Sequence, residues 1–336
     1  MVNAGVIGLG MMGLTHLDYY AKRSDARVVA VADADPDRRS GKVAAKGNIE
    51  GQAQGGFDFS AVKQYADGME LIDDPAVQLV DVCLPTPLHA RFAIAAMRKG
   101  KHVMVEKPLA RTAADADMIV AEAKRSGVIA MPAMCMRFWP GWTWLKSAIA
   151  EKRYGKVLAA HFRRVASHPG GPFYRDGKAC GGAALDLHIH DADFVRWCFG
   201  APKAVTSRGY SIISGCLDHM TTQYHYDDVP LVTAEGGWAM RDGFPFTMQY
   251  TVNFETATAV FDLGAAEKLM LYRKGEKPAA IPVESTMGYE HEIAYMVECV
   301  REGRQPSVVT LAEAAEAVRL IEAEVKSVET GQTIAV

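Results

Sequence analysis

Three glycines near the N-terminus constrain the fold of this chain more than any other feature of its sequence. The segment Gly8-Leu9-Gly10-Met11-Met12-Gly13 follows an apolar run, Val2–Ile7, and precedes a helical stretch that reaches about Arg23. In this setting the first glycine permits a tight turn, the second lets backbone N–H groups approach a pyrophosphate, and the third lets the helix pack closely. The positive end of the helix dipole attracts phosphate. The pattern therefore predicts a dinucleotide-binding turn of Gly8, Gly10, Met11, Met12 and Gly13, with a ligand-free glycine turn as the alternative.

An acidic residue follows the second apolar run at the spacing that this motif requires. The run Arg27–Ala32 ends at Asp33, about 20 residues after the glycines. A carboxylate there accepts hydrogen bonds from ribose hydroxyls and repels a 2′-phosphate, so the sequence favours NAD. Arg38 and Arg39 keep NADP as a less favoured alternative. A helix-capping role is the structural alternative for Asp33, because Pro36 occupies the expected first position of a helix.

The first third of the chain alternates short apolar runs with helical stretches. Further strands are expected at Leu79–Leu84, Lys101–Val105 and Val128–Met134, and helices at a segment ending near Lys99 and at Ala113–Arg125, the latter closed by Gly127. Apolar strands that alternate with helices predict a parallel sheet covered on both faces. Lys46–Ser60 interrupts the alternation and is predicted to be an extended surface loop.

The sequence pattern changes after about residue 135. Helices are expected at Trp142–Ala150 and Ala183–Phe199, and again at about Met287–Glu302 and Leu311–Glu329. Between them, Lys203–Pro282 alternates apolar and polar residues, as at Met248, Tyr250, Val252 and Phe254, with turn signals at Asp227-Asp228 and Asp242-Gly243. This predicts an antiparallel sheet in a second domain, so the chain divides into residues 1–128 and 129–336.

Composition restricts the classes of function. The 336 residues carry 40 acidic and 37 basic side chains, a net charge of −3, so the chain lacks the basic surplus of a nucleic-acid or anionic-lipid binder. Its six cysteines form no CxxC pair and are expected to be reduced. No run of 18 apolar residues and no signal-peptide pattern is present. The expected location is the cytoplasm.

Two segments carry candidate chemistry. Glu106-Lys107-Pro108 follows a predicted strand, and ligands of parallel sheets bind beyond the carboxyl ends of the strands, so Lys107 can reach a substrate hydroxyl or the nicotinamide ribose. A surface Glu-Lys turn is the alternative. Asp186 and His190 lie four residues apart after Gly181-Gly182, so they share one helix face. The carboxylate can fix the imidazole tautomer and raise its basicity for removing a hydroxyl proton. A capping aspartate with a structural histidine is the alternative.

His188 and His190 also suggest a metal site. Residues two apart on a helix point in different directions, and the sequence has no further ligand motif, so no metal is expected.

Together these segments resemble the Gfo/Idh/MocA family of oxidoreductases. The matching positions are Gly8, Gly10, Gly13, Asp33, Pro85-Thr86-Pro87-Leu88-His89, Glu106-Lys107-Pro108, Met136-Arg137-Phe138, Gly181-Gly182, Asp186 and His190. The resemblance covers most of the chain. It implies an N-terminal α/β Rossmann domain and a C-terminal α+β domain with a large, mainly antiparallel sheet. It also implies hydride transfer between a nicotinamide and a hydroxyl–carbonyl pair of a sugar, polyol or inositol.

The resemblance implies a role for each matching position. Lys107 orients the substrate and assists proton transfer, His190 is the general acid/base, and Asp186 is its partner. A cis peptide bond joins Lys107 to Pro108, and the nicotinamide side is lined by Pro85, Thr86, His89 and Glu106. Arg137 and Tyr174 are candidate substrate contacts, with an interface ion pair and a plain loop position as their alternatives. His188 stands where family members often have glycine; it should face away from the pair and could narrow the pocket.

The sequence thus favours an NAD-dependent dehydrogenase of a cyclic sugar or polyol. A non-catalytic NAD(P)-sensing regulator and an NAD-dependent glycosidase on the same fold are the alternatives. The regulator is disfavoured because Lys107, Asp186 and His190 are all present. An apolar face of the antiparallel sheet would need cover, so a homodimer or homotetramer is expected.

Overall fold

The computed structural model describes residues 1–42 and 56–336, which divide into two compact units. The first unit comprises Met1–Cys135 with Gly288–Glu316, and the second comprises Met136–Met287 with Ala317–Val336. The division between residues 128 and 129 stays a prediction. The structure adds that a segment near the C-terminus groups with the first unit.

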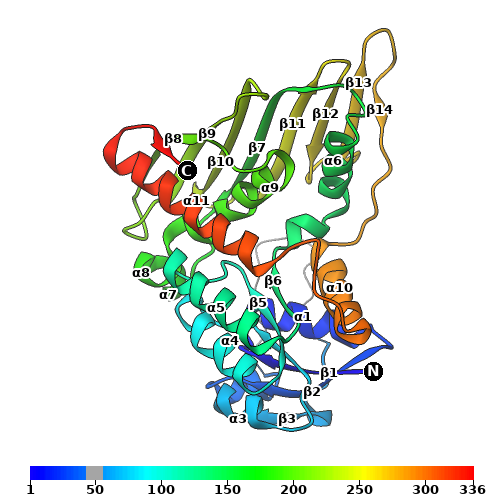
Figure 1. Cartoon of the computed structure of the whole chain (residues 1–336), viewed down its shortest axis with the longest axis vertical. Helices are drawn as coiled ribbons and strands as arrows, with labels where there is room; N and C mark the ends of the chain where they lie inside the picture. The colour runs from blue at the N-terminus through cyan, green and yellow to red at the C-terminus, as the bar shows by residue number, and fades with distance from the viewer. Residues whose placement is uncertain (43–55) are drawn as a thin grey trace. The chain divides into compact units, whose positions relative to one another are not determined.

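The first unit contains a six-stranded parallel sheet (Figure 1). Its strands are β1 (Val2–Ile7), β2 (Ala26–Ala32), β3 (Lys63–Tyr65), β4 (Leu79–Val82), β5 (His102–Glu106) and β6 (Ala130–Ala133), in the order β3-β2-β1-β4-β5-β6. All neighbours pair in parallel. This is the Rossmann order, whose ligand crevice lies where the order reverses, beyond the carboxyl ends of β1 and β4. The predicted Rossmann domain is confirmed.

The helices of the first unit begin and end at recognisable signals. They are α1 (Met11–Ala21), α2 (Pro36–Arg39), α3 (Gly68–Asp73), α4 (His89–Arg98), α5 (Ala113–Ser126) and α10 (Gly288–Glu302), with short 3₁₀ turns η1 (Phe59–Ala61) and η2 (Thr86–Leu88). Helix α5 begins where the Thr112 side chain accepts a hydrogen bond from the Asp115 N–H, and it ends at Gly127 with φ of 67°. Of the predicted loop Lys46–Ser60, residues 46–55 lie outside the described residues, and Phe59 is buried.

The second unit contains a nine-stranded sheet. Its strands are β7 (Val157–Ser167), β8 (Ala204–Tyr210), β9 (His219–His225), β10 (Leu231–Met240), β11 (Thr247–Phe254), β12 (Ala257–Asp262), β13 (Leu269–Arg273), β14 (Ala279–Ala280) and β15 (Ile334–Ala335), in the order β14-β13-β12-β11-β7-β10-β9-β8-β15. Only β7 and β10, among the pairings described, are parallel. The predicted large, mainly antiparallel sheet is confirmed, although the sequence analysis missed its central strand, β7.

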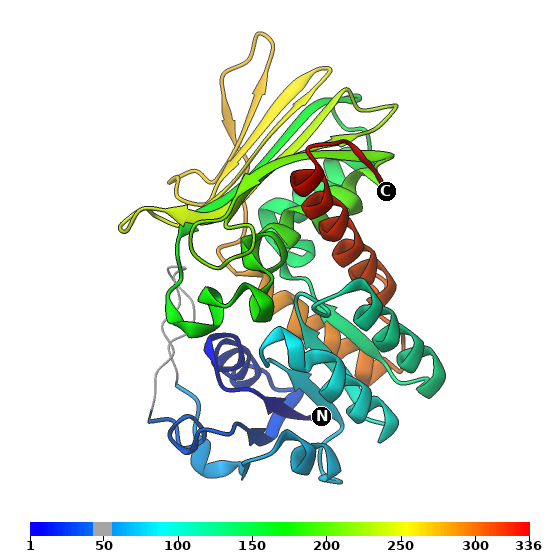
Figure 2. The ribbon, with the colours of Figure 1, turned by 90° about the vertical axis from the view of Figure 1, so that its left-hand side faces the viewer.

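Helices cover one face of this second sheet (Figure 2). Apart from α10, the helical segments described from residue 135 onward are η3 (Cys135–Phe138), α6 (Pro140–Ala150), α7 (Gly171–Arg175), α8 (Gly177–Cys180), the π-helical turn η4 (Ala184–His188), α9 (Ile189–Phe199) and α11 (Leu311–Thr330), which begins in the first unit. Trp142 of α6 is the centre of the core, with its ring centroid 4.7 Å from that of Phe194 and 5.4 Å from that of Tyr250. Such edge-to-face aromatic pairs fix α6 and α9 against the sheet.

The outward face of the same sheet is mainly polar. On β9 and β11 the buried residues alternate with exposed Thr221, Gln223, Thr251 and Asn253. The predicted inward set Met248, Tyr250, Val252 and Phe254 is confirmed as buried. The expected oligomer assumed an apolar outward face, but these strands present a polar one.

All six cysteines are free thiols, as expected. Within residues 1–42 and 56–336, every helix falls short of the length and apolarity needed to cross a bilayer.

Candidate functional site

The glycine turn between β1 and α1 has two crowded positions and one open position. Gly8 has φ of 93°, and a Cβ there would lie 2.5 Å from the carbonyl oxygen of Cys83. A Cβ on Gly13 would lie 1.9 Å from the Gly8 carbonyl oxygen, so the helix packs directly on the turn. At Gly10, no atom of the described residues comes within 4 Å of an added Cβ. The turn therefore leaves room at the one glycine expected to meet a pyrophosphate.

Asp33 connects this turn to the carboxyl end of β2. Its Oδ2 accepts a hydrogen bond from the Leu9 N–H at 2.8 Å, and its Oδ1 accepts one from the Asp35 N–H at 2.9 Å. The cap of α2 is Asp35 rather than Asp33, so the capping alternative for Asp33 is wrong. Arg38 Nη1 lies 3.8 Å from Asp33 Oδ2 and is the nearby cation that could accompany a 2′-phosphate. The open Gly10 and the Asp33 carboxylate, which accepts a hydrogen bond from the same turn, fit the arrangement that a dinucleotide requires.

The loop after β4 is held by His89. Both ring nitrogens of this buried histidine contact backbone carbonyls, Nδ1 that of Pro108 at 2.8 Å and Nε2 that of Leu84 at 2.7 Å. Thr86 is buried and Pro85 is exposed in the same loop. His89 therefore joins the loop after β4 to the loop after β5, and both loops lie at the edge of the sheet where ligands bind.

The segment Glu106-Lys107-Pro108 follows β5 directly. The Lys107–Pro108 peptide bond is cis, as the resemblance implied. Glu106 is buried, and its Oε2 accepts a hydrogen bond from the Lys107 N–H at 2.9 Å. Its Oε1 lies 3.1 Å from His16 Nε2 on α1. Glu106 thus holds the backbone of Lys107 from inside the domain.

A buried polar cluster behind Lys107 was missed by the sequence analysis. His16 Nδ1 lies 2.8 Å from Asp81 Oδ2, and Glu292 of α10 is buried close to both His16 and Glu106. Burial lowers the pKa of His16, but Cys83 and Asp81 outweigh it and leave that pKa well raised. Burial, with Glu106 nearby, raises the pKa of Glu292 well above its usual value. These side chains therefore form one buried network that joins α1, β4, β5 and α10. The sequence signal that could have revealed this cluster is His16 in α1 and Asp81 in β4, because each is a polar residue inside a mainly apolar element.

Asp186 and His190 lie on one side of a helix in the second unit. The chain enters this helix through Gly181 and Gly182, whose φ values are 82° and 71°; a Cβ on Gly182 would lie 2.6 Å from the Leu217 carbonyl oxygen. Asp186 belongs to the π-helical turn η4 and His190 to the first turn of α9. Both are half-buried, whereas His188 between them is fully buried. His188 therefore faces away from the pair, as expected.

Arg137 is held inside the second unit. Its Nε and Nη2 donate hydrogen bonds to Asp193 at 2.9 and 2.7 Å, and both side chains are buried. This geometry is the ion-pair alternative, within one unit rather than at an interface. Tyr174 is half-buried on α7, with its ring 5.7 Å from that of Trp238. For both residues a contact with substrate stays a prediction. So does the convergence of Lys107, in the first unit, with Asp186 and His190, in the second.

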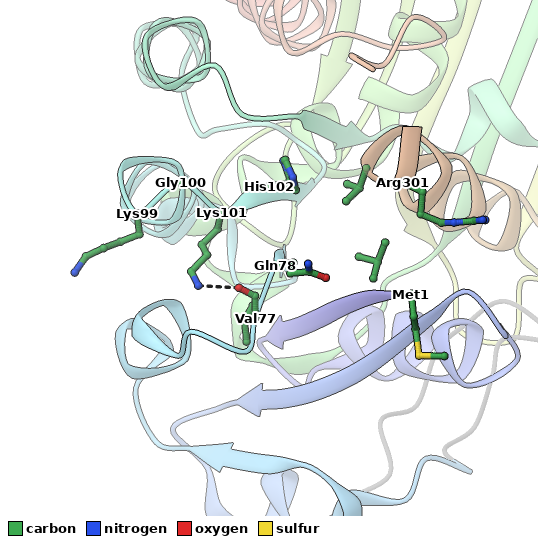
Figure 3. Close-up of a pocket in the computed structure, with 10 residues that line it drawn as sticks. Met1, Val77, Gln78, Lys99, Gly100, Lys101, His102 and Arg301 are labelled. Carbon is green, nitrogen blue, oxygen red and sulfur yellow. Dashed lines mark hydrogen bonds between the residues drawn. The ribbon is translucent and has the colours of Figure 1, made fainter. Parts of the chain in front are cut away.

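A hollow of about 530 Å³ lies elsewhere in the first unit (Figure 3). It is lined by residues at the amino ends of β1, β4 and β5, including Met1, Val77, Gln78 and His102. Lys101 Nζ donates hydrogen bonds to the carbonyls of Asp74 and Val77. Because dinucleotides bind at the carboxyl ends of such strands, this hollow is not the predicted cofactor site.

The sheet order, the glycine turn and Asp33 define a dinucleotide-binding protein with an added α+β domain. The chain belongs to the GFO/IDH/MocA oxidoreductase family: residues 2–134 match the model described as "Oxidoreductase family, NAD-binding Rossmann fold", and residues 142–260 match the "GFO/IDH/MocA C-terminal domain".

Named relatives include two inositol dehydrogenases. The chain is 34% identical to the myo-inositol 2-dehydrogenase of Thermotoga maritima over 197 residues. The aligned segment covers 58% of this chain and 54% of that protein. The matched segment thus spans about half the length of that relative. This chain is also 26% identical to the scyllo-inositol 2-dehydrogenase (NAD(+)) of Bacillus subtilis over 321 residues. That alignment covers 92% of this chain and 89% of the Bacillus subtilis enzyme. A levoglucosan dehydrogenase solved with NADH and levoglucosan has the same fold, with a TM-score of 0.85 at 21% identity, covering 100% and 99% of the two chains.

Proposed function

We propose that this protein is an NAD-dependent dehydrogenase that acts on a CH–OH group of a cyclic sugar, polyol or inositol. The observation that carries the proposal is the half-buried pair Asp186 and His190 on one side of a helix entered through two glycines. The chain's membership in an oxidoreductase family supports it, as do relatives named for inositol oxidation.

Each candidate residue has a separate task. His190 takes the proton from the substrate hydroxyl, and Asp186 orients the imidazole and raises its basicity. The Lys107 ammonium polarises the same oxygen and stabilises the developing alkoxide. When bound, the nicotinamide ring supplies the hydride acceptor. Lys107, Asp186 and His190 must therefore meet around one alcohol.

Cofactor binding falls to residues of the first unit. The backbone of Gly8, Gly10, Met11, Met12 and Gly13 holds the pyrophosphate, and Asp33 accepts hydrogen bonds from the ribose. Pro85 and Thr86 line the nicotinamide side. His89 and Glu106 contribute by holding the loops that carry Pro85 and Lys107, as their contacts with Pro108 and with the Lys107 N–H indicate.

A panel of inositols, sugars and polyols, assayed by the absorbance of NADH, tests this proposal. We expect turnover with at least one of them, severe loss of turnover in His190→Ala, and retained NAD affinity in that variant. His161→Ala is the matched control, because His161 is exposed on β7 and contacts Thr233. Unchanged turnover in His190→Ala would remove His190 from the mechanism. NAD binding without turnover would favour a cofactor-sensing regulator, and aryl-glycoside cleavage without added NAD would favour a glycosidase.

We also propose a homodimer or homotetramer located in the cytoplasm. The surface available for assembly is the mainly polar sheet face that no helix of the described second unit covers (Figure 2), so the contact between copies would be polar rather than apolar. Light scattering coupled to size-exclusion chromatography checks it; a monomeric mass at micromolar concentration would contradict it.

A further inference from the structure

The first turn of the helix that carries His190 rests on a fully buried ion pair. His188 Nε2 lies 3.0 Å from Glu324 Oε2 on α11, and the side chains of both residues have an exposed fraction of 0%. Burying either charge alone would cost roughly several kcal/mol, so each side chain depends on the other to remain buried. The pair joins the π-helical turn η4 to a helix that follows it by more than a hundred residues in sequence.

Polar and charged groups on four neighbouring elements act on His188, and a fifth element, β10, meets it with the glycine backbone of Gly236. The groups are Glu324 on α11, the Tyr224 hydroxyl on β9 at 3.3 Å, Asp191 on α9, Arg164 on β7, and His219 at the start of β9. Burial lowers the pKa of His188, but the charges of Glu324 and Asp191 outweigh it, so that pKa is raised above 6.5. These charges therefore favour the protonated, imidazolium form of His188.

The position of the His188 ring is fixed sterically as well. A Cβ on Gly236 of β10 would lie 2.5 Å from His188 Nδ1 and 2.7 Å from His188 Cβ. The backbone of β10 thus lies directly against the His188 side chain, and this contact requires glycine at position 236. Even one added methyl group would displace the ring.

A second buried pair anchors the next turn of the same helix. Arg164 Nε and Nη2 donate hydrogen bonds to the two carboxylate oxygens of Asp191 at 2.7 and 3.2 Å. Asp191 directly follows His190. The buried side of the helix is therefore tied down at His188 and Asp191, while the other side presents Asp186 and His190, both half-buried.

We propose that His188 and Glu324 form a positioning pair for His190, fixing the rotation of the helical turn so that Asp186 and His190 present one face to the substrate. This inference rests on the proposed dehydrogenase function and names residues that serve it without touching substrate. Since misplacing a catalytic group by about 1 Å costs roughly a hundredfold in rate, the pair acts on kcat.

The test uses Glu324→Gln and Gly236→Ala in the full chain, with His161→Gln as a matched histidine control on the outward face of the sheet. For both variants we expect kcat to fall about tenfold to a hundredfold. The NAD dissociation constant should stay within about twofold of wild type, because cofactor binding lies in the other unit. Rates should be scaled to the folded fraction measured by circular dichroism. Gly236→Ala changes no charge, so it keeps the test decisive if Glu324→Gln fails to fold.

The pH profile of kcat separates positioning from simple stabilisation. Deprotonation of His188 breaks the charged pair, so wild-type kcat should decline at alkaline pH as His188 loses its proton. In Glu324→Gln the neutral amide stabilises the imidazolium less, so this decline should move to lower pH. A merely structural role would lower the melting temperature and leave the profile in place.

The outcomes distinguish the two proposals. If wild type oxidises no member of the panel, or His190→Ala keeps full turnover, the proposed function fails and the positioning role fails with it. If wild type is active and His190→Ala is inactive, while Glu324→Gln and Gly236→Ala keep wild-type kcat and pH profile, only the positioning pair is overturned.

Discussion

Two glycines in one turn should respond in opposite ways to the same substitution. Gly10 has φ of −74° and ψ of −165°, which alanine adopts without strain, and an added Cβ meets no atom of the described residues within 4 Å. Gly10→Ala should therefore fold normally, with a gain of about 0.4–1 kcal/mol from the restricted unfolded chain. At Gly13 the added Cβ would lie 1.9 Å from the Gly8 carbonyl oxygen.

The magnitudes follow from these contacts. Overpacking costs about 1–3 kcal/mol, and the clash at Gly13 is with backbone, so about 3 kcal/mol is expected. For a unit of this size that lowers the melting temperature by roughly 6–12 °C. In Gly10→Ala the methyl group would occupy the space meant for the pyrophosphate. Losing about two charge-assisted hydrogen bonds there costs about 3 kcal/mol or more, roughly a hundredfold in NAD affinity.

The assay pairs thermal unfolding without nucleotide with calorimetric titration of NAD. Gly10→Ala should keep or slightly exceed the wild-type melting temperature and lose NAD affinity, whereas Gly13→Ala should lose thermal stability. Wild-type NAD affinity in Gly10→Ala would show that the pyrophosphate does not approach Gly10. A wild-type melting temperature in Gly13→Ala would refute the close packing of α1 on the turn.

Three further predictions concern single side chains. Asp33→Ala should weaken NAD binding about tenfold, because charged hydrogen bonds to the ribose are lost, and it should narrow the preference for NAD over NADP because Arg38 remains. Dissociation constants for both nucleotides check this, and an unchanged ratio of the two constants would contradict it. Asp193→Asn should lower the free energy of unfolding by about 3–5 kcal/mol, because the buried guanidinium of Arg137 loses its carboxylate; urea unfolding measures it, with exposed Asp227→Asn as control. Burial raises the pKa of Asp218, but hydrogen bonds from Ser214 and Trp238 outweigh it and hold that pKa below 3.8. The ionised Asp218 therefore stabilises the folded protein fully above pH 3.8, and this contribution is lost as pH falls through the lowered pKa. Asp218→Asn should remove that part of the acid dependence of urea unfolding.

Much of the fold could be predicted because its signals are local. The strand Val2–Ile7 was predicted with its observed bounds, since an apolar run before a glycine turn needs no distant information. The stop of α5 at Gly127 follows from the freedom of glycine at positive φ. The alternation of apolar and polar residues on β11 specifies its buried face, because successive side chains of a strand point to opposite faces of the sheet.

The central strand β7 escaped prediction because its pattern includes a charge that only the tertiary structure neutralises. Arg163-Arg164 interrupts the apolar run, yet Arg164 is buried through its hydrogen bonds to Asp191, 27 residues further along the chain. The same holds for His16, whose partners Asp81 and Glu106 lie on other elements. A pattern within ten residues cannot reveal such pairs.

The sequence by itself determined the parallel and antiparallel sheets, the glycine turn and the carboxylate at the end of β2, because periodicity and backbone freedom act between near neighbours. Only the tertiary structure decided which charges are buried and paired: His188 with Glu324, Arg137 with Asp193, and His16 with Asp81. Burial of a charge is tolerated when an opposite charge arrives from a distant segment, and that meeting exists only once the chain has folded.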